Sequence, residues 1–243
     1  MLQNYSKLPK FIKALALPVW VVVSFYMTQI IVVVALRLLI AVGVPVMSLN
    51  SSVLNATAAA AIYLITLIIV IGLPWLIKKR STSLKDIGLT RLPTWTDILM
   101  APAGLIIYIF LSAILIYITT QILPGFDINQ AQDTGFSGIN QRYELILAFI
   151  TLVVVAPIAE EVLFRGYLYG KIKKYLPIWV AILLTSVTFG FLHGAWNLGV
   201  DTFALSVILC LLRESTGNIW SSILLHMAKN GIAFYFLFIV SLH

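Results

Sequence analysis

Charge is scarce in this 243-residue sequence. Only 10% of the residues are charged and 61% are hydrophobic, whereas soluble domains carry about 25% charged residues. A soluble fold is therefore excluded. Cysteine is nearly absent as well, because Cys210 is the single one. An intrachain disulfide and a cysteine-rich metal site are thus excluded too.

Several catalytic signatures are also missing. The sequence contains no glycine-rich phosphate loop, no serine in a nucleophile-elbow context and no contiguous His-Glu-x-x-His zinc motif. Nucleotide and serine chemistry are therefore disfavoured. The net charge of +7 raises the question of a nucleic-acid partner. In a membrane protein, however, basic residues mark cytoplasmic loops, so no nucleic-acid partner is expected.

Long apolar runs separated by short polar patches fill the sequence instead. A bilayer core of about 30 Å needs about 20 apolar residues in one helix. Residues 58–73 are apolar almost without a break, which favours helices over the alternating strands of a barrel. We predict an all-α, polytopic transmembrane bundle forming one membrane domain over residues 1–243, with a motif-bearing core at 143–241. About seven spans are expected, at 15–45, 54–77, 98–123, 145–168, 178–196, 200–213 and 218–241.

The basic residues predict how this bundle is oriented. Basic residues concentrate in cytoplasmic loops, and a cytoplasmic N-terminus leaves only Arg142 in the outer loops. The inner segments then hold Lys7, Lys10, Lys13, Lys78, Lys79, Arg80, Lys85, Arg91, Lys171, Lys173, Lys174 and Arg213. The small size and short loops favour a bacterial cell membrane, with a eukaryotic endomembrane as the alternative.

The fourth predicted span carries a pair of carboxylates and an arginine. Charged groups at membrane depth are costly and are functional candidates by default. Glu161 and Arg165 are four residues apart and can pair on one helix face. Glu160 points about 100° away from Glu161 on a regular helix, so it can face another neighbour. The alternative is that both carboxylates end the helix at the water interface.

Two further clusters lie on the fifth and seventh spans. The fifth contains Phe189 and His193, and the seventh contains His226 and Asn230 at a spacing that places them on one face. A single histidine on an apolar helix is more often a packed, hydrogen-bonded residue than a catalyst. The second pair is equally consistent with a hydrogen bond that ties two helices together. Lys229 either reaches the interface or pairs with an acid.

Together, the carboxylates and histidines on three spans predict one shared cavity. Such a cavity would supply what peptide hydrolysis needs: a carboxylate base, a histidine that shares its proton, and donors for an oxyanion. We expect it to open toward the cytoplasmic side. Counted at about 1.5 Å per residue, Glu160 and His226 lie roughly 8 to 15 Å from the inner face, but His193 lies about 24 Å away.

These residues resemble the CPBP family, which comprises CAAX proteases and bacteriocin-processing enzymes and is also called the Abi family. The family pattern is Glu-Glu-x-x-x-Arg, Phe-x-x-x-His and His-x-x-x-Asn, and all three motifs occur in order within residues 157–232. The resemblance implies an intramembrane protease in which Glu160 and His193 activate water. It also implies that His226 and Asn230 stabilise the oxyanion, while Glu161 and Arg165 brace the site.

The resemblance leaves the cofactor and the substrate open. Glu160, His193 and His226 are candidate ligands for a divalent metal such as zinc, and a glutamate-activated water without metal is the alternative. A prenylated C-terminus, a bacteriocin leader and a signalling peptide all suit a hydrophobic cavity. Two other functions compete with proteolysis: a catalytically silent scaffold or regulator of a membrane enzyme, and a proton-coupled transporter. The sequence does not indicate an oligomeric state.

Overall fold

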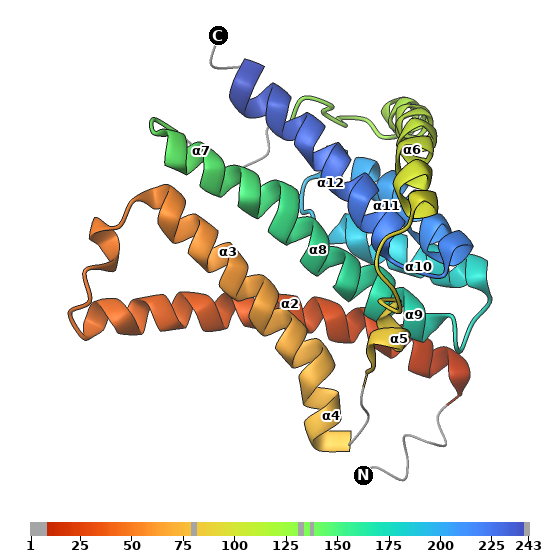
Figure 1. The fold of residues 1–243 in the computed structure, drawn as a ribbon, viewed down its shortest axis with the longest axis horizontal. Helices are drawn as coiled ribbons and strands as arrows, with labels where there is room; N and C mark the ends of the chain where they lie inside the picture. The colour runs from red at the N-terminus through yellow and green to blue at the C-terminus, as the bar shows by residue number, and fades with distance from the viewer. Residues whose placement is uncertain (1–8, 79–81, 131–133, 137–138, 241–243) are drawn as a thin grey trace.

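The computed structural model describes residues 9–78, 82–130, 134–136 and 139–240. Every regular element among them is a helix, as the composition predicts. Lys7, Lys79 and Arg80 of the orientation argument, and residue 241 of the last predicted span, lie outside the described residues. Figure 1 shows the helices crossing at steep angles around α8, α11 and α12. The helices in chain order are α2 (Lys10–Ala41), η1 (Val46–Ser48), α3 (Ser51–Leu67), η2 (Ile68–Gly72), α4 (Leu73–Lys78), α5 (Leu84–Ile87), α6 (Trp95–Ile122), α7 (Arg142–Phe149), η3 (Ile150–Val155), α8 (Ala156–Glu161), η4 (Val162–Tyr169), α9 (Gly170–Ile172), α10 (Ile178–Phe191), α11 (Trp196–Thr216), α12 (Trp220–Phe234) and η5 (Tyr235–Ile239).

Within the described residues, five helical segments are long and apolar enough to cross a membrane, rather than the seven predicted. They are Lys10–Ala41, Ser51–Ile77, Trp95–Ile122, Arg142–Ile172 and Trp220–Ile239. The predicted fifth span is α10, an apolar helix of only 14 residues. The predicted sixth span is α11, which carries Asp201, Arg213 and Glu214 and buries nine of its residues in the bundle. These nine residues pack α11 against its neighbours α6, α10 and α12.

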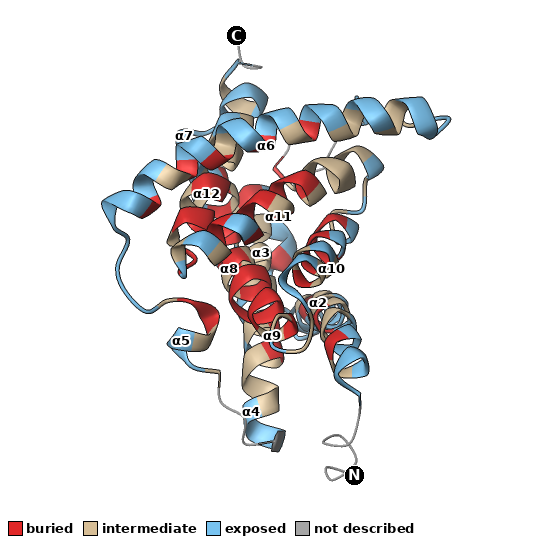
Figure 2. Cartoon of the chain, turned by 90° about the vertical axis from the view of Figure 1, so that its right-hand side faces the viewer, coloured by how far each residue is buried: buried red, intermediate tan, exposed pale blue. Residues whose placement is uncertain are grey.

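Burial and exposure separate the core from the lipid-facing surface. Figure 2 shows buried residues gathered along α8, α9, α11 and α12 in the middle of the bundle, with exposed residues along the flanks of α6. The exposed flanks are strongly apolar, for example Ile30 at 64% and Phe110 at 67% exposure. Such surfaces suit a hydrocarbon environment. The chain is therefore an integral membrane protein.

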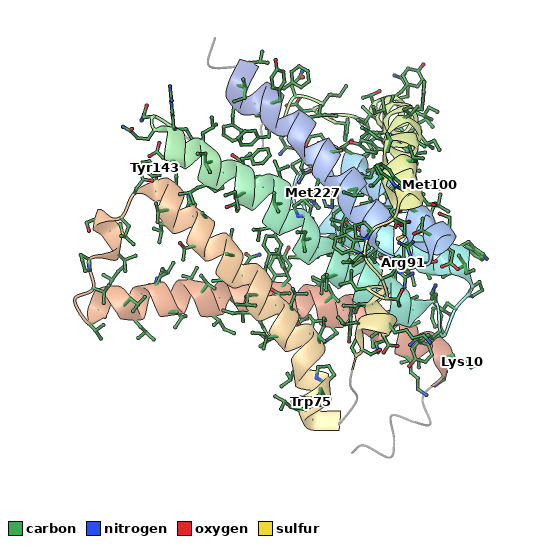
Figure 3. The ribbon with its side chains drawn as sticks, in the orientation of Figure 1. Lys10, Trp75, Arg91, Met100, Tyr143 and Met227 are labelled. Carbon is green, nitrogen blue, oxygen red and sulfur yellow. The ribbon has the colours of Figure 1, made fainter. Side chains whose placement is uncertain are left out.

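The helix ends gather at two ends of the bundle. The first, here called the basic end, contains the start of α2, the end of α4, α5, α9 and the turn before α12. The N–H of Ile219 in that turn donates to the carbonyl of Gly88 after α5, at 3.1 Å. The second, here called the loop end, contains η1, the described residues 123–130, 134–136 and 139–141, and the turn after α10. The Asn197 amide of α11 donates to the carbonyl of Ile128 there, at 3.0 Å. Lys10 and Tyr143 mark the two ends in Figure 3.

A close approach of α10 to α11 fixes the position of the turn that follows α10. A Cβ on Gly190 would lie 2.6 Å from the carbonyl oxygen of Gly199, which no side chain tolerates. The turn itself passes through Gly194, whose φ is +75°. These glycines hold His193, three residues after Gly190, against the start of α11.

Candidate active site

Two π-helical segments flank the short helix α8 that carries both glutamates. The N–H of Ala156 already bonds to the carbonyl of Thr151, five residues earlier. The next such bond would need an N–H from Pro157, which proline lacks. The carbonyl of Leu152 is thereby left for another partner. Such π segments often occur at functional sites.

Leu152 finds that partner on α12. The side-chain amide of Asn230 donates to the Leu152 carbonyl at 2.9 Å. An Asn amide has two N–H donors, so the second remains for another acceptor. The gap in the backbone ladder before Pro157 therefore sets the orientation of Asn230.

Glu161 is fully buried and lies between an arginine and a histidine. Its Oε1 accepts from Arg165 at 2.7 Å and lies 2.8 Å from Nδ1 of His226. Glu161 and Arg165 are both 0% exposed. A buried ion pair is costly to break because one charge would be left without its partner. The pair thus holds α8, η4 and α12 in register.

Glu160 has a different environment. Its Oε1 accepts from the hydroxyl of Tyr63 on α3 at 2.6 Å. Its Oε2 lies 3.7 Å from Nε2 of His226, beyond hydrogen-bond distance, and its side chain is 15% exposed. One carboxylate oxygen of Glu160 is therefore available on the cavity side.

His193 lies at the end of α10 with a defined tautomer. Its Nδ1 lies 2.8 Å from the carbonyl oxygen of Phe189. A carbonyl only accepts, so Nδ1 carries the proton and, in the neutral ring, Nε2 keeps its lone pair. Phe189 also lies under both histidines, with ring centroids 4.7 Å from His193 and 5.9 Å from His226.

One cavity of about 310 Å³ joins these side chains. Glu160, His193, His226 and Asn230 line it, whereas Glu161 and Arg165 lie behind its wall. The three motifs thus converge as expected. Despite the depths counted from the sequence, His193 lines the same cavity as Glu160 and His226. The lining continues from Glu160 to Thr134 and Phe238 at the loop end, whereas the opening was expected toward the cytoplasmic, basic end.

The sequence analysis missed two groups around the cavity. Tyr63, which donates to Glu160, lies within an apolar run that carries no motif. Asp201 lies 3.4 Å from Lys229 and accepts from the hydroxyls of Tyr108 at 2.7 Å and Ser112 at 2.6 Å. The ionisable Asp201 on a core helix was the available signal, and it gives Lys229 its acidic partner.

The metal-ligand hypothesis does not fit this geometry. Among the described residues, no three His, Cys, Asp or Glu side chains are grouped closely enough to hold one ion. Both ring nitrogens of His226 face glutamates, and Nδ1 of His193 bonds to a backbone carbonyl. No catalytic step is therefore assigned to a metal.

Part of the chain is also similar to a family of known proteins. Residues 142–232 match the family described as Type II CAAX prenyl endopeptidase Rce1-like. This segment is similar to that family. The matched segment begins at the first residue of α7 and ends just after Asn230, so it contains all three motifs and every motif residue of the cavity.

Bacterial relatives match overlapping parts of the chain. The "UPF0177 protein YxdF" of Lactococcus lactis is 30% identical over 113 residues, which cover 46% of this chain and 59% of that protein. The "Putative membrane peptidase YdiL" of Bacillus subtilis is 27% identical over 134 residues, covering 55% and 54%. The chain thus spans about half the length of the curated relatives it matches. No solved structure matches it.

Proposed function

We propose that the chain is an intramembrane endopeptidase of a bacterial cell membrane, in which Glu160 and His193 activate the attacking water. The observation that carries the proposal is the contrast between the two adjacent glutamates. Glu161 is buried and paired, whereas Glu160 presents one oxygen to a cavity that His193 also lines. The similarity of residues 142–232 to the Rce1-like family, and the relative named as a membrane peptidase, support the same reaction class.

Water activation would use two acceptors that line the cavity. Glu160 Oε2 takes one proton from a water, while the Nε2 lone pair of His193 accepts a hydrogen bond from the same water. The water oxygen then forms a bond to the carbonyl carbon of the substrate, and the carbonyl π electrons move to its oxygen. A positioned base of this kind contributes about 10²- to 10⁴-fold to the rate.

Charge stabilisation would come from α12. The second N–H of Asn230, and Nε2 of His226 when it carries a proton, are the donors for the tetrahedral oxyanion. As the intermediate collapses, the C–N bond breaks and the protonated Glu160 returns its proton to the leaving amine. The carbonyl double bond forms again, so the products are one new carboxylic acid, which then releases its proton to solvent, and one new amine. Glu161 and Arg165 act as positioning residues, because they hold His226 without reaching the cavity.

The cavity wall favours an apolar peptide as the substrate. Phe25, Phe164, Phe189, Phe234 and Phe238 contribute aromatic surface around the few polar groups. Its volume of about 310 Å³ lies at the lower end of the range for ligand pockets. A short extended segment fits such a space, and a folded domain does not.

The experiment is a cleavage assay on the purified full chain in lipid nanodiscs, with a defined library of apolar peptides and mass spectrometry of the products. The parent should release fragments with new carboxyl and amino termini. Glu160→Gln should lower the rate about 10²- to 10⁴-fold because an amide cannot take the proton from water. Asn129→Ala, at an exposed loop position, is the control and should cleave at the parent rate.

Two results would replace the proposal. Equal cleavage by the parent, Glu160→Gln and His193→Ala would exclude the proposed water activation. A cellular phenotype that survives Glu160→Gln but is lost with the whole protein would favour the scaffold or regulator function.

A further inference from the structure

The lining of the cavity extends farther toward the loop end than toward the basic end. On α12 and η5 its lining begins at His226 and continues to Phe238, close to the end of η5 at the loop end. On α10 and α11 it is confined to the residues around the loop-end turn, such as Leu192 and Leu198. Thr134, in the loop itself, completes the lining.

Burial changes along this path from the candidate catalytic residues to the loop end. Leu163, Phe164 and Phe189 form the floor beside Glu160, with exposed fractions of 3%, 4% and 0%. Leu237 lies at the rim and is 53% exposed. Buried side chains thus border the cavity on the side of the basic end, and more exposed ones border it on the side of the loop end.

The charges indicate which membrane face each end meets. Lysines and arginines are concentrated in cytoplasmic loops. Among the described residues, Arg37 and Arg142 are the basic residues close to the loop end. The basic end carries Lys10, Lys13, Lys78, Lys85, Arg91, Lys171, Lys173 and Lys174. This asymmetry places the basic end in the cytoplasm and the loop end outside.

We propose that the cavity opens to the extracytoplasmic side and accepts an apolar peptide segment presented there, either exported or lying in the outer leaflet. That the bound peptide is then cleaved rests on the proposed function. The direction from which it enters rests on the residues that line the cavity. A prenylated C-terminus of a cytoplasmic protein would have to enter from the basic end, where buried side chains close the path. The cavity thus selects for peptides that have already reached the outer half of the membrane.

Cysteine accessibility tests the route without any cleavage. Cys210, the single native cysteine, is 0% exposed, so Cys210→Ala provides the background. Single cysteines are then added at three positions: Ala233→Cys in the cavity, Asn129→Cys at the loop end and Lys85→Cys at the basic end. Intact bacterial cells expressing each variant are treated with a membrane-impermeant maleimide, before and after permeabilisation.

The inference expects labelling of Asn129→Cys and Ala233→Cys in intact cells, and of Lys85→Cys only after permeabilisation. Labelling of Ala233→Cys only together with Lys85→Cys would overturn it. So would labelling of Asn129→Cys only after permeabilisation, because the loop end would then be cytoplasmic. An Ala233→Cys thiol that never reacts would show a cavity closed to water, which also contradicts the inference. Since none of these outcomes depends on peptide hydrolysis, they do not bear on whether Glu160 is catalytic.

Discussion

Asp97 on α6 and Glu160 on α8 are carboxylates within the same bundle, yet their surroundings differ. Asp97 is 0% exposed and accepts hydrogen bonds from Arg91, from the backbone and hydroxyl of Thr94 at 2.8 and 2.9 Å, and from Ser221 at 3.0 Å. Glu160 accepts one bond from Tyr63 and faces the cavity. A saturated carboxylate stabilises helix ends, whereas a carboxylate with an unused oxygen beside a cavity can take a proton.

The ion pair between Glu161 and Arg165 is buried behind the cavity wall and is the second carboxylate environment to compare. Arg165→Met should lower the free energy of unfolding by about 3–5 kcal/mol, because the buried charge of Glu161 loses its partner. Denaturant or thermal unfolding in detergent measures the effect. Lys173→Met is the matched control, since its ion pair with Glu214 is partly exposed and should contribute less than about 1 kcal/mol. Equal losses in both variants would contradict the bracing role.

The saturated carboxylate can be tested by a single-atom change. Asp97→Asn should lower the free energy of unfolding by about 1.5–3 kcal/mol, the usual contribution of hydrogen bonds to a charged group. The amide keeps one oxygen as an acceptor but cannot accept from Thr94 and Ser221 together with Arg91. The folded fraction should retain the parent cleavage rate. A rate that falls while the unfolding free energy stays unchanged would place Asp97 in the reaction instead.

Tyr63 donates a hydrogen bond to Glu160, the proposed catalytic base. Tyr63→Phe should lower kcat about tenfold, which corresponds to about 1.4 kcal/mol or one hydrogen bond. KM should stay unchanged, because the hydroxyl orients Glu160 rather than binding substrate. Tyr26→Phe, on the exposed side of α2, is the control and should match the parent. A rise in KM with constant kcat would assign Tyr63 to substrate binding.

Substitution of Asp86, which lies at the basic end outside the spans, should have the smallest effect on the free energy of unfolding. The hydrogen bond from Lys174 lowers the pKa of Asp86 below its usual range, with help from Ser83. The contribution of the Asp86 carboxylate to the free energy of unfolding is therefore complete above the unfolded pKa of about 3.9. This contribution is lost as the pH falls below that value. Asp86→Asn should cost less than about 1 kcal/mol at neutral pH. Unfolding scans from pH 7 to acid should be flatter in the variant than in the parent.

The sequence was sufficient to predict the helical class and the meeting of the three motifs. Each motif combines polar groups with helical spacing. Polar groups within membrane spans are expected to face the interior of the bundle or a cavity, because lipid does not solvate them. Of the seven predicted spans, the two that correspond to α10 and α11 are not among the five described helical segments that are long and apolar enough to cross a membrane. Hydropathy alone does not show whether an apolar helix faces lipid or protein. The helix α11, which carries Asp201, lies in the bundle core, and only the packing reveals this.

Tyr63 and the direction of the cavity could not be predicted for a related reason. Tyr63 reaches Glu160 across 97 positions of the chain, and nothing in its own apolar run marks it. The direction depends on which aromatic side chains close the floor, such as Phe164 and Phe189. The hydrogen bond from Asn230 to the carbonyl of Leu152 likewise depends on the π segment before Pro157, which no residue pattern predicts.

A crossed measurement on Glu160→Gln and Asp97→Asn tests the central claim most directly. Both variants replace one carboxylate oxygen by an amide nitrogen, and both are assayed for peptide cleavage per folded molecule and for the free energy of unfolding. The account predicts that Glu160→Gln loses cleavage with little change in stability, and that Asp97→Asn loses stability while its folded fraction cleaves at the parent rate. Cleavage retained in Glu160→Gln would contradict it.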